Sequence, residues 1–114
     1  MLVDEKAIEK ARNARRCDGD NIQEMTRTFT RLNQELQLYV DKLIAGKQRL
    51  TDKEKQRLQY LLKVQRMMVL KPLDPGVPVA ERLQYDNQNH RVNSIRQALK
   101  EVERRYGMRI LPIV

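Results

Sequence analysis

Cysteine, histidine and aromatic residues are scarce in this sequence, and each scarcity excludes a class of protein. The 114 residues include one cysteine, one histidine, one phenylalanine, four tyrosines and no tryptophan. A single cysteine cannot form an intrachain disulfide and fits a reducing compartment. One cysteine and one histidine cannot assemble the usual zinc site within a monomer. We therefore expect neither a metal nor a cofactor.

Long apolar runs are missing as well. The opening segment, MLVDEKAIEK, has two acidic residues where a signal peptide would have a basic and then an apolar region. No stretch approaches the roughly 20 apolar residues that cross a bilayer. We expect a soluble protein with no signal peptide, no transmembrane segment and no membrane partner, located inside the cell or within an assembled particle.

The sequence also lacks a recognisable catalytic set and a glycine-rich phosphate loop. Cys17 follows Arg15 and Arg16, whose charges could lower the thiol pKa. Nucleophilic chemistry also needs a base and a group that orients it, and His90 lies about seventy residues away with no third member. We expect no enzymatic activity and no small-molecule substrate.

Helix-forming residues dominate what is present. The chain has only four glycines and four prolines, is 33% charged and 40% hydrophobic, and has the length of one domain, residues 1–114. The expected fold is all-α: a helical hairpin or a small bundle of three to four helices with coiled-coil-like seams and an extended apolar C-terminal tail. The approximate helices are 4–16, 21–45, 52–70 and 79–106, with a proline-rich connector at 71–78 and a tail at 107–114.

Local start and stop signals set these boundaries. Asp4 can cap the first helix, and Asp20 or Asn21 can cap the second, with Glu24 placed as in a capping box. Thr51 and Glu54 form a second capping-box pattern. Gly46 and Gly107 are natural helix stops, because glycine readily adopts the left-handed conformation at a C-terminus.

Two of the expected helices carry apolar residues at alternating spacings of three and four, which is the pattern of a heptad seam. In the second helix these residues are Ile22, Met25, Phe29, Leu32, Leu36, Tyr39 and Leu43. In the fourth helix they are Val92, Ile95, Leu99, Val102 and Tyr106, preceded by Tyr85 and Gln88. The seams fit packing inside one bundle or, alternatively, a coiled coil with another chain. Gln88 fits either a frayed, wet helix start or a paired polar seam position.

The C-terminal tail holds four aliphatic side chains around Pro112, which prevents them from forming a helical stripe. They are Ile110, Leu111, Ile113 and Val114. Leaving all four in water is unfavourable, so we expect the tail to dock, either across the chain's own helices or into a partner.

Positive charge is the remaining feature. The formal net charge is +8 and the pI is about 9.9, which favours polyanionic neighbours. In the third helix Lys55, Lys63 and Arg66 share one side, opposite the apolar arc. They form either a solvated face or a tentative polyanion contact, and Tyr60 on a neighbouring side could stack on an unpaired base.

Three functional hypotheses follow. The first is a non-enzymatic structural or adaptor subunit that docks by its seams and tail into a larger assembly, virion-like or ribonucleoprotein-like, with protein partners or as a homo-oligomer. The second is a basic nucleic-acid-binding or replication accessory protein. The third is a small helical inhibitor of a larger enzyme. Steep salt dependence of binding to arbitrary nucleic acid would favour the second.

Overall fold

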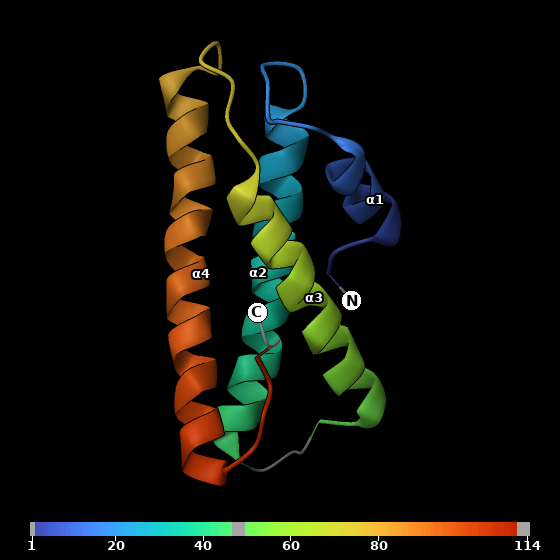
Figure 1. The fold of residues 1–114 in the computed structure, drawn as a ribbon, viewed down its shortest axis with the longest axis vertical. Helices are drawn as coiled ribbons and strands as arrows, with labels where there is room; N and C mark the ends of the chain where they lie inside the picture. The colour runs from blue at the N-terminus through green and yellow to red at the C-terminus, as the bar shows by residue number, and fades with distance from the viewer. Residues whose placement is uncertain (1, 47–49, 112–114) are drawn as a thin grey trace.

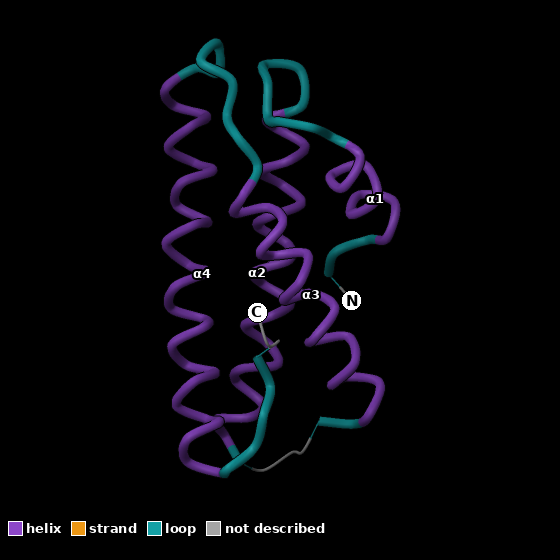
Figure 2. The backbone as a smooth tube through the Cα atoms, in the orientation of Figure 1, coloured by secondary structure: helices purple, strands orange, loops and turns teal. Residues whose placement is uncertain are grey.

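The computed structural model describes residues 2–46 and 50–111, and these form four helices. They are α1 (Glu5–Asn13), α2 (Ile22–Ala45), α3 (Asp52–Leu70) and α4 (Val79–Tyr106). α2 contacts all three other helices, and its contact with α4 is the most extensive (Figure 1). Figure 2 shows the same backbone with helices joined only by loops. The predicted all-α small bundle is confirmed.

Local capping explains most helix ends. The Asp4 carboxylate accepts a hydrogen bond from Lys6 N at 2.7 Å, and Thr51 and Glu54 form the reciprocal capping box at the start of α3. Gly46 and Gly107, both at φ 65°, end α2 and α4 in the left-handed conformation.

The capping box predicted at the start of α2 is wrong. Asn21 is the N-cap residue, but its side chain makes no capping hydrogen bond to the helix. Its Oδ1 instead accepts from Asp18 N at 2.8 Å, within the preceding turn. The Asn21 side-chain oxygen is therefore used within the preceding turn and does not cap the helix.

α1 ends at Asn13, three residues before the predicted end at residue 16. Beyond Ala14 the backbone pairs with the connector instead of continuing the helix: Cys17 N donates to Pro72 O at 2.9 Å, and Asp74 N donates to Cys17 O at 2.8 Å. These bonds satisfy backbone groups that a longer helix would have used internally.

Both seams lie inside the bundle, where they face each other and α3. The seam residues whose exposed fraction is below one tenth are Ile22, Met25, Phe29, Leu32, Leu36, Tyr39, Val92, Ile95, Leu99 and Val102. Phe29 and Tyr85 meet edge to face across α2 and α4, with ring centroids 5.1 Å apart. Leu43 is partly buried against this core. The seam spacing therefore reflects packing within the chain.

Tyr106 is the seam residue that the structure places differently. It is 54% exposed, although its spacing continues that of Leu99 and Val102. The C-terminal end of α2 lies beside Tyr106, since a Cβ atom placed on Gly46 would be 3.9 Å from the Tyr106 hydroxyl. Tyr106 thus sits beside the capped end of α2, where no further turn covers it.

The described part of the tail docks on the chain's own helices. It turns back along the bundle after Gly107 (Figure 1), and Ile110 is buried while Leu111 is partly buried against the core. One oxygen of the Glu103 carboxylate accepts from Ile110 N at 2.7 Å and from Leu111 N at 3.0 Å. Ile113 and Val114 lie outside the described residues.

We expect Ile110→Ala to lower the free energy of unfolding by about 2 kcal/mol, because it removes most of a buried aliphatic side chain. Urea unfolding followed by circular dichroism measures the loss, and the native helical signal should be unchanged. The neighbouring exposed residue supplies the control, since Arg109→Ala should stay within about 0.5 kcal/mol of the parent. Equal effects of the two substitutions would show that the tail is not docked.

Within residues 2–46 and 50–111, no helix combines the length and apolar character needed to cross a membrane.

Candidate nucleic-acid interface

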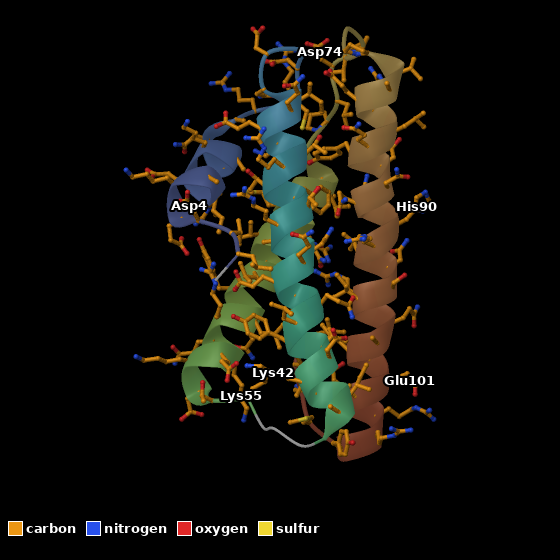
Figure 3. All side chains as sticks on the ribbon, turned by 180° about the vertical axis from the view of Figure 1, so that it is seen from behind. Asp4, Lys42, Lys55, Asp74, His90 and Glu101 are labelled. Carbon is orange, nitrogen blue, oxygen red and sulfur yellow. The ribbon has the colours of Figure 1, made fainter. Side chains whose placement is uncertain are left out.

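The basic stripe predicted on α3 is exposed along its whole length. Lys55, Lys63 and Arg66 are all solvent-accessible, and the helix turns Leu58, Leu61 and Leu62 into the core on the other side. Figure 3, seen from behind, shows Lys55 at the N-terminal end of α3.

α4 places a further cation beside this stripe. Arg96 Nε donates to Gln65 Oε1 at 3.1 Å, and Arg96 Nη2 donates to Leu62 O at 3.0 Å, so the guanidinium bridges from α4 to α3. Lys100 follows one turn later on the same side of α4 and is exposed. We call Lys55, Lys63, Arg66, Arg96 and Lys100 together the α3–α4 basic face.

No carboxylate is paired with a cation of this face in the described residues. The salt bridges found there involve none of its five cations. Burial lowers the pKa of Arg96, and the neighbouring positive charge of Arg66 lowers it further. Arginine nevertheless stays protonated at neutral pH, so two like charges are held close together without a counter-charge.

The charge pattern of the sequence accounts for this. Residues 55–73 include five Lys and Arg residues and no Asp or Glu. Residues 87–100 include three Lys and Arg residues and again no Asp or Glu. These two acid-free segments cover most of α3 and the middle of α4. Arg96 and Lys100 were not among the sequence candidates, although the second segment was a signal that could have found them.

A buried polar network fixes Arg96 in position. Gln65, fully buried on α3, accepts from Arg96 and donates through Nε2 to Asn33 Oδ1 at 2.9 Å. Asn33 Nδ2 in turn donates to Gln88 O and Gln88 Oε1 at 3.2 and 3.1 Å. Gln88 is therefore a paired polar position and not part of a frayed helix start. Because buried amides are costly when unpaired, this network holds three helices and one surface guanidinium in register.

A second polar cluster lies on the α1 side of the bundle. The Glu35 carboxylate, whose side chain is 2% exposed, accepts from Arg57 Nε and Tyr39 Oη at 2.9 Å each and from the N–H groups of Leu2 and Val3. Arg57 also pairs with Glu5 at the start of α1 and donates to Val3 O. This cluster ties the N-terminal segment to α2 and α3, and each of its charged side chains has a partner of opposite charge.

The pKa values in this cluster follow from its contacts. Burial by itself would raise the pKa of Glu35, but hydrogen bonds from Arg57, Tyr39 and Val3 outweigh it and the pKa is lowered. Burial and the adjacent Glu35 carboxylate raise the pKa of Tyr39 to about 12.

We expect stability to fall in acid partly through Glu35. A carboxyl whose pKa is lower in the folded state stabilises above its unfolded value of about 4.3, and this contribution is lost as pH falls from there through the folded pKa. Urea unfolding between about pH 7 and pH 2.5 should show that loss in the parent and a shallower decline in Glu35→Gln. Parallel pH profiles of the two proteins would contradict the assignment.

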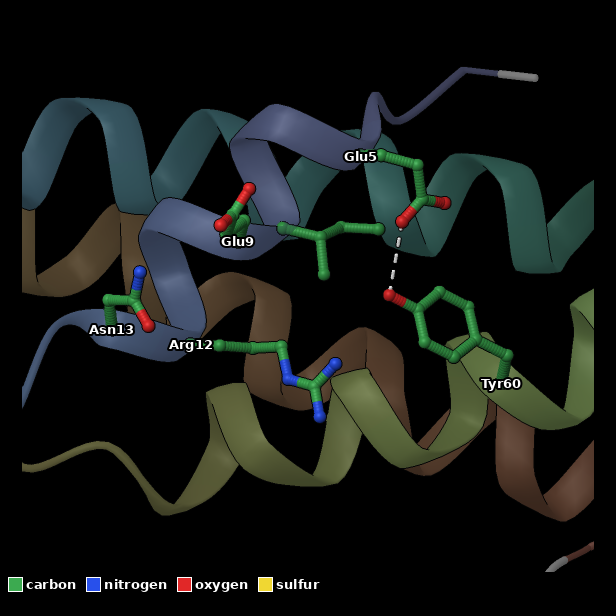
Figure 4. A pocket seen from close by; sticks show the side chains of 6 residues that line it. Glu5, Glu9, Arg12, Asn13 and Tyr60 are labelled. Atoms are coloured by element: carbon green, nitrogen blue, oxygen red, sulfur yellow. Dashed lines mark hydrogen bonds between the residues drawn. The ribbon is translucent and has the colours of Figure 1, made fainter.

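A shallow hollow on the outer side of α1 and α3 is unrelated to the basic face. Glu5, Glu9, Arg12, Asn13 and Tyr60 line it with Ile8 (Figure 4). Tyr60 Oη donates to Glu5 Oε2 at 3.1 Å, and the Arg57 guanidinium lies 5.9 Å from the ring centroid. The suggestion that Tyr60 stacks on a base is therefore not supported, because its ring and hydroxyl already have partners.

The sequence candidates for reactive chemistry are not brought together. Cys17 is buried, and burial raises the pKa of its thiol, opposite to the effect considered for Arg15 and Arg16. His90 is exposed and lies on the outer side of α4 (Figure 3). Among the residues the structure describes, no group of His, Cys, Asp and Glu could hold a metal ion.

Comparisons with known proteins give no match: no family model, no curated protein and no solved structure corresponds to this chain.

Proposed function

We propose that this protein binds nucleic acid through the α3–α4 basic face. The observation that carries the proposal is the set of five cations on α3 and α4, which Arg96 bridges, with no carboxylate paired to them in the described residues. A row of uncompensated Lys and Arg neutralises phosphates and releases their counterions, which drives binding.

Arg96 adds a fixed element to that face. Its Nε and one Nη donate to Gln65 and Leu62, so its orientation is set before any ligand arrives. The remaining N–H groups of a guanidinium suit phosphate oxygens, and preorganisation lowers the entropy cost of forming such contacts. A charge that only faces solvent would need no such hydrogen bonds to buried residues.

The adaptor hypothesis remains a proposal with less support. Its expected contact surfaces were the seams and the tail, and the described residues of both are largely packed within the chain's own core. An adaptor role would have to use other surfaces.

The test is a triple substitution with a matched control. Lys63→Gln, Arg66→Gln and Lys100→Gln together lower the net charge from +8 to +5 on the basic face. Arg27→Gln, Arg31→Gln and Arg91→Gln lower it equally at exposed positions of α2 and α4 that are not part of that face. Thermal unfolding should be similar in both variants and the parent, because all six side chains are exposed.

We expect the basic-face variant to bind a labelled duplex roughly 100-fold more weakly at about 50 mM salt, and the logarithmic salt slope to decrease by about 2 to 3. Fluorescence anisotropy measures both quantities. The control variant should lose far less affinity. Equal losses of affinity in the two variants would show that the effect comes from net charge alone. Unchanged binding by the basic-face variant would reject this face as the contact.

A further inference from the structure

The proposed function leaves open whether the ligand is single-stranded or double-stranded. Proteins that bind single strands without sequence preference combine a basic groove with exposed aromatic side chains on which bases stack. Proteins that bind a duplex through its backbone need only cations and hydrogen-bond donors on a fixed surface. The positions of the aromatic residues and the shape of the basic face therefore distinguish the two classes.

All five aromatic residues of the chain are accounted for, and none lies on the basic face. Phe29, Tyr39 and Tyr85 are buried, and Tyr60 is held by Glu5 on the α1 side. Tyr106 is exposed, but it lies at the end of α4 beside Gly46. The basic face thus has no stacking platform for unpaired bases.

The cations of the face lie in two rows along the rigid helices α3 and α4. Lys55 and Arg66 are separated by about 16 Å along α3, and Arg96 and Lys100 by about 6 Å along α4, at 1.5 Å per residue. The bonds from Arg96 to Leu62 and Gln65 hold the two rows together. A duplex presents one phosphate per about 1.7 Å of its axis, twice the density of one strand, on a similarly stiff frame.

The geometry also opposes reading of bases. α4 lies beside α3 at the level of Arg96, and α1 also contacts α3. Toward its N-terminus α3 diverges from α4 (Figure 1). Where Arg96 bridges α3 and α4, two helices, each about 10–12 Å across, are wider than the roughly 12 Å major groove. At that level the face can follow phosphates along the groove edges but cannot place a single helix within the groove.

We propose, on the basis of the proposed function, that the ligand is a nucleic-acid duplex, bound through its phosphate backbone without sequence preference. DNA and RNA duplexes share this chemistry. Binding depends on salt and on the spacing of the cations, and not on base identity.

The experiment measures binding of the full chain to four labelled probes by anisotropy at fixed salt. The probes are two DNA duplexes of unrelated sequence and about 20 base pairs, an RNA duplex of the same length, and a single strand of about 20 nucleotides. We expect the two DNA duplexes to bind within about twofold of each other and at least about tenfold more tightly than the single strand. The RNA arm shows whether the shared chemistry extends to A-form duplexes or is confined to DNA.

Each outcome separates this inference from the proposed function. A single strand bound as tightly as the duplexes would overturn the duplex inference while leaving nucleic-acid binding intact. A strong preference between the two DNA sequences would overturn backbone recognition. Tyr106→Leu provides a second check, because a selective loss of single-strand affinity would reveal a stacking contact that the structure does not support on this face. Failure to bind any probe would reject the proposed function itself.

Discussion

Arg57→Met is expected to lower the free energy of unfolding by about 3 to 5 kcal/mol, because it leaves the Glu35 carboxylate buried without its cation. The Glu35 side chain is 2% exposed and that of Arg57 is 13% exposed, so water can replace the lost partner only poorly. Arg57 also holds Val3 O and Glu5, so its removal loosens the N-terminal segment as well.

The double substitution Glu35→Met with Arg57→Met tests the cause of that loss. Replacing a whole buried ion pair by apolar residues is often close to neutral, so the double variant should recover part of the stability lost in the single one. Recovery should be incomplete, because Tyr39 Oη and the N–H groups of Leu2 and Val3 lose their acceptor. A loss below about 1 kcal/mol in Arg57→Met, measured by urea unfolding, would contradict the importance of the pair.

Leu36→Ala and Leu99→Ala are each expected to cost about 2 to 5 kcal/mol, because both side chains are fully buried where α2 meets the rest of the core. Each substitution removes apolar surface from the core and leaves a cavity that the bundle can close only in part. Urea unfolding of the full chain measures both losses.

Leu38 offers a control of the same type on the same helix. It is 50% exposed, so Leu38→Ala should change stability by no more than about 0.5 kcal/mol. If Leu36→Ala were as mild as Leu38→Ala, the internal packing of the seams would be wrong.

Features encoded within a few residues could be predicted from the sequence. The Thr51–Glu54 capping box and the glycines at 46 and 107 fix helix ends by local hydrogen bonds and backbone conformation, and α3 and α4 begin and end where predicted. The seam spacing identified the buried sides of α2 and α4, since a helix places residues three and four apart on one side.

Features that depend on distant partners could not be predicted. The residues around Arg16 favour helix locally, but Cys17 pairs with a connector more than fifty positions later. Asn33 and Glu35 are polar residues between apolar positions of α2, and their burial depends on Gln65 and Arg57, 32 and 22 residues away. The spacing of apolar residues along one helix does not predict polar pairs between different helices.

The candidate site shows the same division. Lys55, Lys63 and Arg66 could be found from spacing within one helix. The acid-free segment 87–100 could have pointed to Arg96 as a cation, but not to its place beside α3. That place depends on how α4 is rotated against α3, and the packing of the core sets the rotation.

The most direct test of the nucleic-acid interface is an NMR titration of the isotope-labelled full chain with a short DNA duplex, following each backbone amide. We expect the shifts to concentrate on α3 between Lys55 and Arg66 and on α4 between Arg96 and Lys100, with the Arg96 side-chain Nε–H signal among the most affected. The amides around Arg27 and Arg31 on α2 should change little. Shifts centred on α2, or none at duplex concentrations that saturate other backbone-binding proteins, would contradict the assignment of the α3–α4 basic face.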